Sequence, residues 1–151
     1  MGMELVHSFT VPADPPRTWE LLTDLQQVGG CFPGATVTSA DEETFEGEVK
    51  VKLGPIAVTY QGKGRFLERD DQSHHAKIEG LGRGLRGLGN ATALATIDLA
   101  PHEGGTKVDV VTDLSITGKP AQFGRGVMQS VSDKLLGQFV ACLESRLAEE
   151  P

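Results

Sequence analysis

Hydrophobic and polar residues alternate along much of the chain with a period of two, which is the pattern of a β-strand that buries one face. The pattern is clearest in residues 44–54, where Val49 and Val51 alternate with charged side chains. It recurs, with varying strength, in residues 3–13, 55–69, 73–81, 89–100 and 106–117. Because only short turn signals separate most of these stretches, we predict that neighbouring strands pair antiparallel.

Helical spacing replaces the alternation in two places. Residues 14–25 begin with Asp14 and Pro15, which are residue types preferred at the N-cap and in the first turn of a helix. From Pro120 onward, apolar residues three and four apart predict one long C-terminal helix. Residues 26–35, with three glycines and a proline, predict at most one turn of helix and then a bend.

This order of elements predicts one α+β domain over residues 1–151. The strands would form a single curved antiparallel sheet with one apolar face, which has to be covered. The C-terminal helix is the only predicted element long enough to cover it. The chain contains no internal repeat and no linker that would divide it.

A glycine-rich segment at residues 82–87 reads Gly-Arg-Gly-Leu-Arg-Gly and matches the G-x-G-x-x-G phosphate-binding pattern. Phosphate binding requires a helix directly after the glycines, whereas residues 89–100 have the pattern of a strand. We therefore predict a hairpin. Its leucines and arginines are unusual for a solvent loop and suit contact with a membrane surface, an apolar ligand or a partner protein; alternatively, the leucines fold back on the core. The residues are Leu81, Arg83, Leu85, Arg86 and Leu88.

Composition excludes several classes of protein. The chain has 14 basic and 21 acidic residues and a net charge of −7, without a run of Lys or Arg, so we expect no nucleic-acid partner. No apolar run approaches the ~20 residues needed to span a bilayer. Cys31 and Cys142 lie far apart and no secretory signal precedes them, so we predict two reduced thiols in a cytoplasmic protein rather than a disulfide.

Catalytic and metal-binding patterns are weak. His74 and His75 are adjacent in a predicted strand, so their side chains point to opposite faces of the sheet and do not bind one ion together. No residues in sequence proximity form a nucleophile with its base. We predict a protein that is not an enzyme, with no metal site and no catalytic cofactor.

Several short segments form a pattern of their own. They are CFPGA (31–35), YQGKG (60–64), GNATA (89–93), Gly-Gly-Thr (104–106) and ITGKPAQFGRG (116–126). Together they resemble the carbon monoxide dehydrogenase CoxG family of the START-like superfamily, over nearly the whole chain. The resemblance implies a helix-grip fold, in which a curved seven-stranded antiparallel sheet wraps around the long C-terminal helix and leaves a cavity between them.

The resemblance also implies partners. Family members are linked to molybdenum-containing carbon monoxide dehydrogenases, which implies a role in their membrane association or maturation, beside that enzyme or a related molybdenum hydroxylase. Several members continue past the long helix into a linker and a membrane-anchoring segment, whereas this sequence ends at Pro151, which implies an unanchored member or a trimmed chain. The expected location is the cytoplasm, peripheral to the inner face of the cell membrane.

Small residues support a cavity beside the C-terminal helix. Ala91, Ala93 and Ala95 share one face of a predicted strand, and Gly62 and Gly64 interrupt another. The cavity would be apolar, with the Tyr60 hydroxyl as its one evident polar group, able to bond a carbonyl oxygen. The predicted ligand-binding residues are Phe32, Val49, Val51, Val58, Tyr60, Phe66, Ile78, Ala93, Phe123, Val127, Met128, Val131 and Leu135.

These features predict a non-catalytic carrier of a hydrophobic ligand. A cytoplasmic enzyme that oxidises carbon monoxide must pass electrons to the respiratory chain, whose membrane acceptor is an isoprenoid quinone, so we expect menaquinone or another isoprenoid lipid as the ligand. One alternative is a membrane-recruitment or assembly adaptor without a ligand, which binds through residues 118–126. A second is a START-like cyclase or aromatase, which would need polar groups inside the cavity.

Overall fold

Strands account for most of the chain in the computed structural model, which describes residues 2–149. The strands are β1 (Gly2–Val11), β2 (Ala35–Ala40), β3 (Thr44–Leu53), β4 (Ile56–Asp70), β5 (His75–Gly84), β6 (Asn90–His102) and β7 (Gly105–Ile116). The helices are α1 (Pro15–Leu22), α2 (Leu25–Cys31) and α3 (Gly124–Glu149), with short 3₁₀ helices η1 (Leu85–Gly87) and η2 (Lys119–Phe123).

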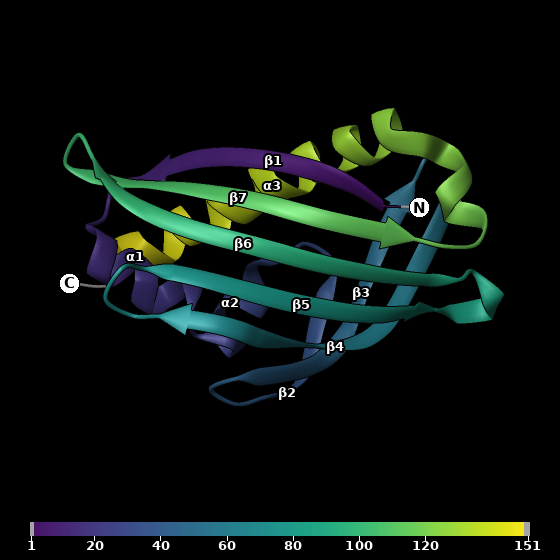
Figure 1. Ribbon diagram of the computed structural model, residues 1–151, viewed down its shortest axis with the longest axis horizontal. Helices are drawn as coiled ribbons and strands as arrows, with labels where there is room; N and C mark the ends of the chain where they lie inside the picture. The colour runs from purple at the N-terminus through teal and green to yellow at the C-terminus, as the bar shows by residue number, and fades with distance from the viewer. Residues whose placement is uncertain (1, 150–151) are drawn as a thin grey trace.

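The seven strands form one sheet in the order β1-β7-β6-β5-β4-β3-β2, and every neighbouring pair is antiparallel. The sheet curves, and β3 crosses the direction of β6 and β7 steeply (Figure 1). The three α-helices lie behind the sheet in this view, so the face turned to the viewer is the outer face. The predicted α+β architecture, an antiparallel sheet with a long C-terminal helix against it, is confirmed.

Most element boundaries follow from local chemistry. The Asp14 carboxylate accepts a hydrogen bond from the Arg17 backbone N–H and caps α1, as predicted, and Asp24 caps α2 in the same way through Gln27. The prediction of at most one turn in this region was wrong, because capped α2 runs for 7 residues.

Two further elements differ from the sequence prediction. The long helix begins at Gly124 rather than near Pro120, because η2 comes first and Gly124 adopts a φ of 75°. The pattern of alternation did not identify β2, whose short run of small polar residues carries little hydrophobic signal.

The buried core divides into two groups. The Trp19 cluster joins α1, α2, the β6–β7 region and the C-terminal half of α3, and includes Trp19, Leu22, Leu143 and Leu147. The Tyr60 cluster lies around the start of α3 and consists of Leu53, Val58, Tyr60, Ile116 and Met128. The sheet and α3 are thus packed tightly towards both ends of the helix.

Cys31 and Cys142 form a disulfide between α2 and α3, with an S–S distance of 2.10 Å. The prediction of two reduced thiols was therefore wrong. The residues are 111 positions apart in sequence, but the packing of α2 on α3 brings their Cα atoms to 5.4 Å, within the range that a disulfide spans. Only the tertiary structure carries that information.

The glycine-rich segment is a hairpin, as predicted. β5 ends at Gly84, η1 follows, and β6 begins at Asn90, so no helix starts where a phosphate would have to bind. Gly87 and Gly89 adopt φ values of 71° and 88°, which favour glycine, and allow the tight reversal. Within residues 2–149, no helix is long and apolar enough to cross a membrane.

Candidate ligand-binding site

The structure places the predicted ligand-binding residues on two facing elements and one connection. On the inner face of the sheet lie Val49 and Val51 (β3), Val58, Tyr60 and Phe66 (β4), Ile78 (β5) and Ala93 (β6). Opposite them lie Phe123 (η2) and Val127, Met128, Val131 and Leu135 (α3). Phe32 follows α2, is 42% exposed, and its ring centroid lies 6.4 Å from that of Phe139 on α3.

These residues do not form one continuous packed group. Val49, Val51, Val58, Tyr60, Phe123, Met128 and Val131 belong to the Tyr60 cluster or pack against it, and Phe66 packs against the Trp19 cluster. Ile78, Ala93, Val127 and Leu135 belong to neither and are only partly buried. Apolar side chains of the inner face are therefore left partly exposed between the two clusters, as the lining of a ligand site would be.

Two rows of small residues cross the inner face in this region. Strand register aligns Gly47, Gly62, Gly82 and Ala91 in one row and Phe45, Gly64, Gly80 and Ala93 in the next. A Cβ atom added at Gly80 would meet no atom within 4 Å, whereas one added at Gly64 would lie 2.3 Å from the Phe45 ring. The inner face is thus open at Gly80 and covered at Gly64.

Tyr60 lies one row from the Gly62–Gly82 row, on the inner face of β4. The residue is 7% exposed, and its hydroxyl is buried without a hydrogen-bond partner among the described residues. Burial raises the pKa of the Tyr60 phenol, so the group is a neutral donor at physiological pH. A buried hydroxyl without a partner costs free energy, and a ligand oxygen placed beside it would recover that cost.

The hollows visible on the surface lie elsewhere. One, of about 560 Å³, lies on the outer face between β3 and β6 and includes Gln61, Lys63, Arg83 and Asn90 in its lining. A second, of about 420 Å³, lies over β1, β6 and β7. Both are shallow and largely open to solvent. We therefore place the candidate site on the inner face, which carries both the buried Tyr60 hydroxyl and the open position at Gly80.

The predicted contact residues divide between two environments. Leu81 and Arg83 lie on the outer face of β5, and Leu81 is 41% exposed. Leu85 and Arg86 lie in η1 at the tip of the hairpin. Leu88 packs against the Tyr60 cluster, so its side chain helps to hold the hairpin on the core.

The segments that adjoin this hairpin contain no acidic residue, although Glu46 on β3 lines the same outer-face hollow as Arg83. None of the 21 acidic residues falls within residues 49–63, 80–97 or 114–132. These segments are neighbours through strand pairing and through the packing of Phe123 against the cluster that contains Leu53 and Val58. They contain seven basic residues: Lys50, Lys52, Lys63, Arg83, Arg86, Lys119 and Arg125.

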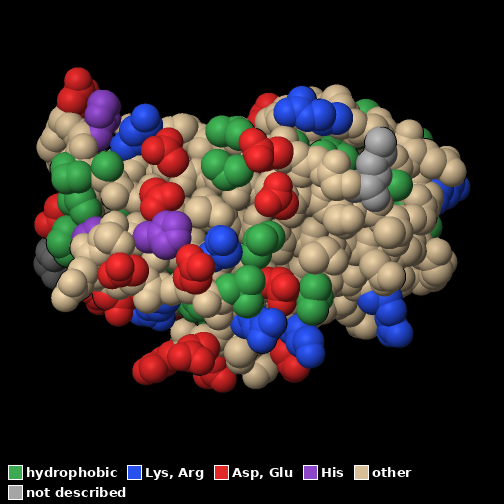
Figure 2. All heavy atoms as spheres, viewed as in Figure 1, with side chains coloured by type: hydrophobic (Ala, Val, Ile, Leu, Met, Phe, Trp, Pro, Cys, Tyr) green, Lys and Arg blue, Asp and Glu red, His purple; other side chains and the backbone are tan. Residues whose placement is uncertain are grey.

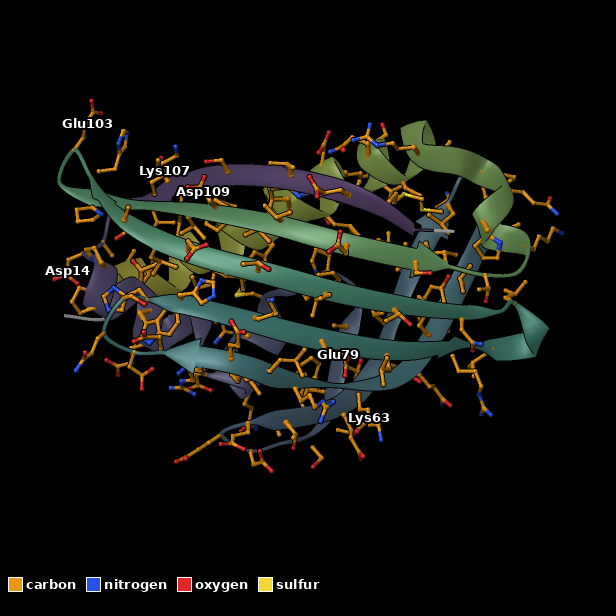
Figure 3. The ribbon with its side chains drawn as sticks, in the orientation of Figure 1. Asp14, Lys63, Glu79, Glu103, Lys107 and Asp109 are labelled. Carbon is orange, nitrogen blue, oxygen red and sulfur yellow. A yellow bond between two sulfur atoms is a disulfide. The ribbon has the colours of Figure 1, made fainter. Side chains whose placement is uncertain are left out.

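The figures show the same segregation of charge. On the right-hand side of Figure 2, where the hairpin lies, Lys and Arg side chains stand at the rim of the surface, and acidic side chains gather towards the left and the centre. Among the labelled residues of Figure 3, Asp14, Glu103, Lys107 and Asp109 lie towards the end opposite the hairpin.

One polar pair near the inner face was not predicted. His7 on β1 and Asp133 on α3 are 3.0 Å apart (Nε2 to Oδ1), and the Gln129 side chain donates to the same carboxylate at 2.8 Å. The His7 side chain is 11% exposed and that of Asp133 is 59% exposed. The alternation of residues 3–13 placed His7 on the inner face, but no sequence signal linked it to a residue 126 positions away.

The described residues contain no group of three or more His, Cys, Asp or Glu side chains positioned to hold a metal ion. His75 lies on the outer face, where its ring nitrogens contact Asp98 at 2.6 Å and Glu68 at 3.2 Å. Hydrogen bonds to Asp98 and then Glu68 raise the pKa of His75. This cluster lies on the face of the sheet opposite the candidate site and contributes no residue to it.

Comparison with known proteins gives a family and a fold. The family model for the carbon monoxide dehydrogenase protein CoxG matches residues 8–148. A conserved protein from Geobacillus kaustophilus is similar in structure, with a TM-score of 0.84 and 19% identity over 97% of this chain and 96% of that chain. No curated protein sequence matches the chain.

Two more distant structures share the fold. Ara h 8.0201 has a TM-score of 0.70 at 14% identity, over 99% of this chain and 100% of its own. The aromatase/cyclase Zhui from a Streptomyces species has a TM-score of 0.67 at 12% identity, over 97% of this chain and 93% of its own. At these identities the comparisons establish the helix-grip fold and leave the chemistry to the residues of the site.

Proposed function

Because the chain belongs to the carbon monoxide dehydrogenase CoxG family, we propose that it is a non-catalytic carrier that holds a hydrophobic ligand between the sheet and α3. The ligand would be an isoprenoid quinone of the menaquinone type or a related isoprenoid lipid. In this role the protein links a molybdenum-containing carbon monoxide dehydrogenase, or a related molybdenum hydroxylase, to the membrane respiratory chain. It would work in the cytoplasm, at the inner face of the cell membrane.

The buried Tyr60 hydroxyl is the observation that carries this proposal. It has no partner among the described residues, and it stands next to an inner face made of glycine, alanine and partly exposed apolar side chains. A ligand with one carbonyl oxygen and a long apolar tail matches that arrangement. The carbonyl would accept the Tyr60 hydrogen bond, and the tail would cover Ile78, Ala93 and Leu135.

The energetics favour a long tail. Burial of about 400 Å² of isoprenoid surface yields about 10 kcal/mol at about 25 cal/mol per Å². Association costs about 4–15 kcal/mol in lost freedom, so burial of the tail has to supply most of the favourable free energy of binding. The hydrogen bond to Tyr60 adds about 1 kcal/mol and fixes the orientation of the head group.

Exchange of such a ligand with a bilayer needs a contact surface. The hairpin with Leu81, Arg83, Leu85 and Arg86 is the proposed surface, because the segments that adjoin it carry basic residues and no acidic ones. Anionic headgroups attract clustered Lys and Arg, whereas the remaining surface of this acidic chain repels them. The carrier would therefore approach the membrane with this hairpin first.

Native mass spectrometry tests the proposal. Purified protein mixed with menaquinone-2 in mild detergent should show a one-to-one complex. Val131→Trp should abolish the complex without unfolding the protein, because Val131 faces the site from α3 and is only half buried. Gln138→Trp is the matched control, since Gln138 is exposed on the same helix and the complex should persist. A wild type that binds neither menaquinone-2 nor any co-purifying lipid contradicts the carrier and favours the adaptor.

The His7–Asp133 pair favours a second candidate function. A histidine held by a carboxylate is the usual form of a general base, and the fold is shared with an aromatase/cyclase. In that case the protein would cyclise or aromatise a polyketide chain bound at the same inner face. Turnover of an aromatic polyketide precursor by the wild type, lost in His7→Asn, would establish the enzyme and exclude a purely carrying role.

A further inference from the structure

The Cys31–Cys142 disulfide lies beside the candidate site. Cys31 is the last residue of α2, and Cys142 lies in the C-terminal half of α3. Phe32 follows Cys31 directly, and its ring packs on that of Phe139, which precedes Cys142 by one helical turn. The covalent bond and the ring contact therefore fasten the same short piece of chain to α3.

The other end of this piece is fastened to the sheet. We define the Phe32 strap as residues 32–34. The Gly34 carbonyl accepts a hydrogen bond from the Lys50 backbone N–H on β3 at 3.0 Å. The next residue, Ala35, pairs with Val49. The strap thus runs from α3 to the β3 wall of the candidate site, and its fixed position depends on the disulfide at one end.

Arg146 makes the disulfide easier to reduce. Its Nε donates a hydrogen bond to the Cys31 Sγ at 3.1 Å. A cation beside a sulfur stabilises the thiolate, so Cys31 is the better leaving group when the bond is attacked. Cys31 is 4% exposed, whereas Cys142 is only partly buried, so an incoming thiolate reaches Cys142 first.

We propose that the disulfide is a redox latch that controls the position of the Phe32 strap. A thiolate of a dithiol reductant attacks the Cys142 Sγ, the S–S bond breaks, and its electron pair goes to the Cys31 Sγ beside Arg146. The second thiol of the reductant then resolves the mixed disulfide. In sum, two electrons and two protons pass from the dithiol to Cys31 and Cys142, and the reductant becomes a disulfide.

Reduction removes the covalent link at the end of α2 and leaves the strap held to α3 by the non-covalent contacts of Cys31 with Arg146 and of Phe32 with Phe139. The latch rests on the proposed function for its purpose: an oxidised carrier would retain its ligand, and a reduced carrier would exchange it. The opening itself is a property of the chain and can be measured without any ligand.

Hydrogen-exchange mass spectrometry of oxidised and dithiothreitol-reduced wild type tests the latch. Exchange in residues 25–34 should become about tenfold faster or more on reduction, while residues 90–100 in the centre of the sheet keep their rate. Equal rates in residues 25–34 before and after reduction overturn the proposal. Acceleration of both regions also overturns it, because the disulfide would then hold the whole fold rather than the strap.

Two sets of variants complete the test. Cys31→Ser with Cys142→Ser should show fast exchange in residues 25–34 with or without dithiothreitol; if it does not fold, the reduced wild type supplies the same comparison. Arg146→Gln should slow reduction by dithiothreitol about threefold or more, while Arg125→Gln at the other end of α3 leaves the rate unchanged. An unchanged rate in Arg146→Gln overturns the role of Arg146 in the latch.

Uptake of menaquinone-2, followed by native mass spectrometry in both redox states, separates the latch from the proposed function. Faster uptake by the reduced protein supports both. Opening of residues 25–34 without uptake in either state supports the latch and contradicts the quinone carrier. Uptake at the same rate in both states, despite opening, supports the carrier and overturns control of its ligand by the latch.

Discussion

Substitution of alanine at Gly80 and at Gly62 tests whether the inner face is open. Both glycines lie on that face of neighbouring strands, and neither has a positive φ. A Cβ atom at Gly80 would meet nothing within 4 Å, whereas one at Gly62 would lie 1.8 Å from the Leu81 carbonyl oxygen. The same change of one methyl group therefore has opposite consequences at two nearby positions of the sheet.

The expected magnitudes follow from these contacts. Glycine in a strand costs about 0.5–1 kcal/mol relative to alanine, so Gly80→Ala should raise the free energy of unfolding by about that amount. At Gly62 the new methyl group would overlap main-chain atoms, which do not rotate away, and the strands have to separate. Gly62→Ala should lower the free energy of unfolding by about 1–3 kcal/mol or more.

Urea denaturation followed by circular dichroism measures both changes. With a slope of about 1–3 kcal/mol per molar urea, Gly80→Ala should raise the midpoint by a few tenths of a molar, and Gly62→Ala should lower it by at least as much. If Gly80→Ala destabilises the protein as strongly as Gly62→Ala does, then packed atoms occupy the space above Gly80. The candidate site would then be refuted, whatever the family suggests.

Three further predictions concern single side chains. Tyr60→Phe should leave the stability of the unliganded protein unchanged or raise it by up to about 1 kcal/mol in urea denaturation, because the hydroxyl has no partner among the described residues. The same variant should bind menaquinone-2 about three- to tenfold more weakly in titration, because the hydrogen bond to the ligand is lost. His75→Gln should lower the free energy of unfolding mainly below about pH 6.5, because hydrogen bonds to Asp98 and Glu68 raise the pKa of His75 and the stabilisation they give disappears as the pH rises through that pKa. Urea midpoints at about pH 5.5 and 8 check this, and an equal loss at both pH values would contradict it. Asp14→Ala should lower the melting temperature by about 2–4 °C by calorimetry, because α1 loses its N-cap.

The fold was predictable because its main signals are local. Alternation in residues 44–54 and 55–69 sets which side chains face α3, and Asp14 with Pro15 marks the start of α1. These patterns depend on the period of the backbone and on residues a few positions apart. The predicted faces are confirmed in the structure because the alternation within a single strand determines which of its side chains are buried.

The site was only partly predictable because its contacts are not local. The alternation placed Tyr60 on the inner face, but the lack of a partner for its hydroxyl among the described residues depends on what α3 and the sheet bring near it. The Cys31–Cys142 bond and the His7–Asp133 pair join residues more than 100 positions apart. Their distances are set by how α3 packs on α2 and on β1, which no short window of sequence encodes.

The choice between carrier and enzyme depends on which functional groups share the inner face. Catalysis requires an acid or base within about 2.6–3.2 Å of the reacting group. The two candidates here, Tyr60 on β4 and His7 on β1, are separated by β5, β6 and β7, which is about 19 Å along the sheet at about 4.8 Å per strand. Between them the inner face carries mainly glycine, alanine and aliphatic side chains, and Thr112 on β7 adds a hydroxyl but no acid or base. The Tyr60 hydroxyl can orient a head group, and the mainly apolar inner face can cover a tail. Because Tyr60 and His7 do not act together on one bond, the arrangement suits binding better than chemistry.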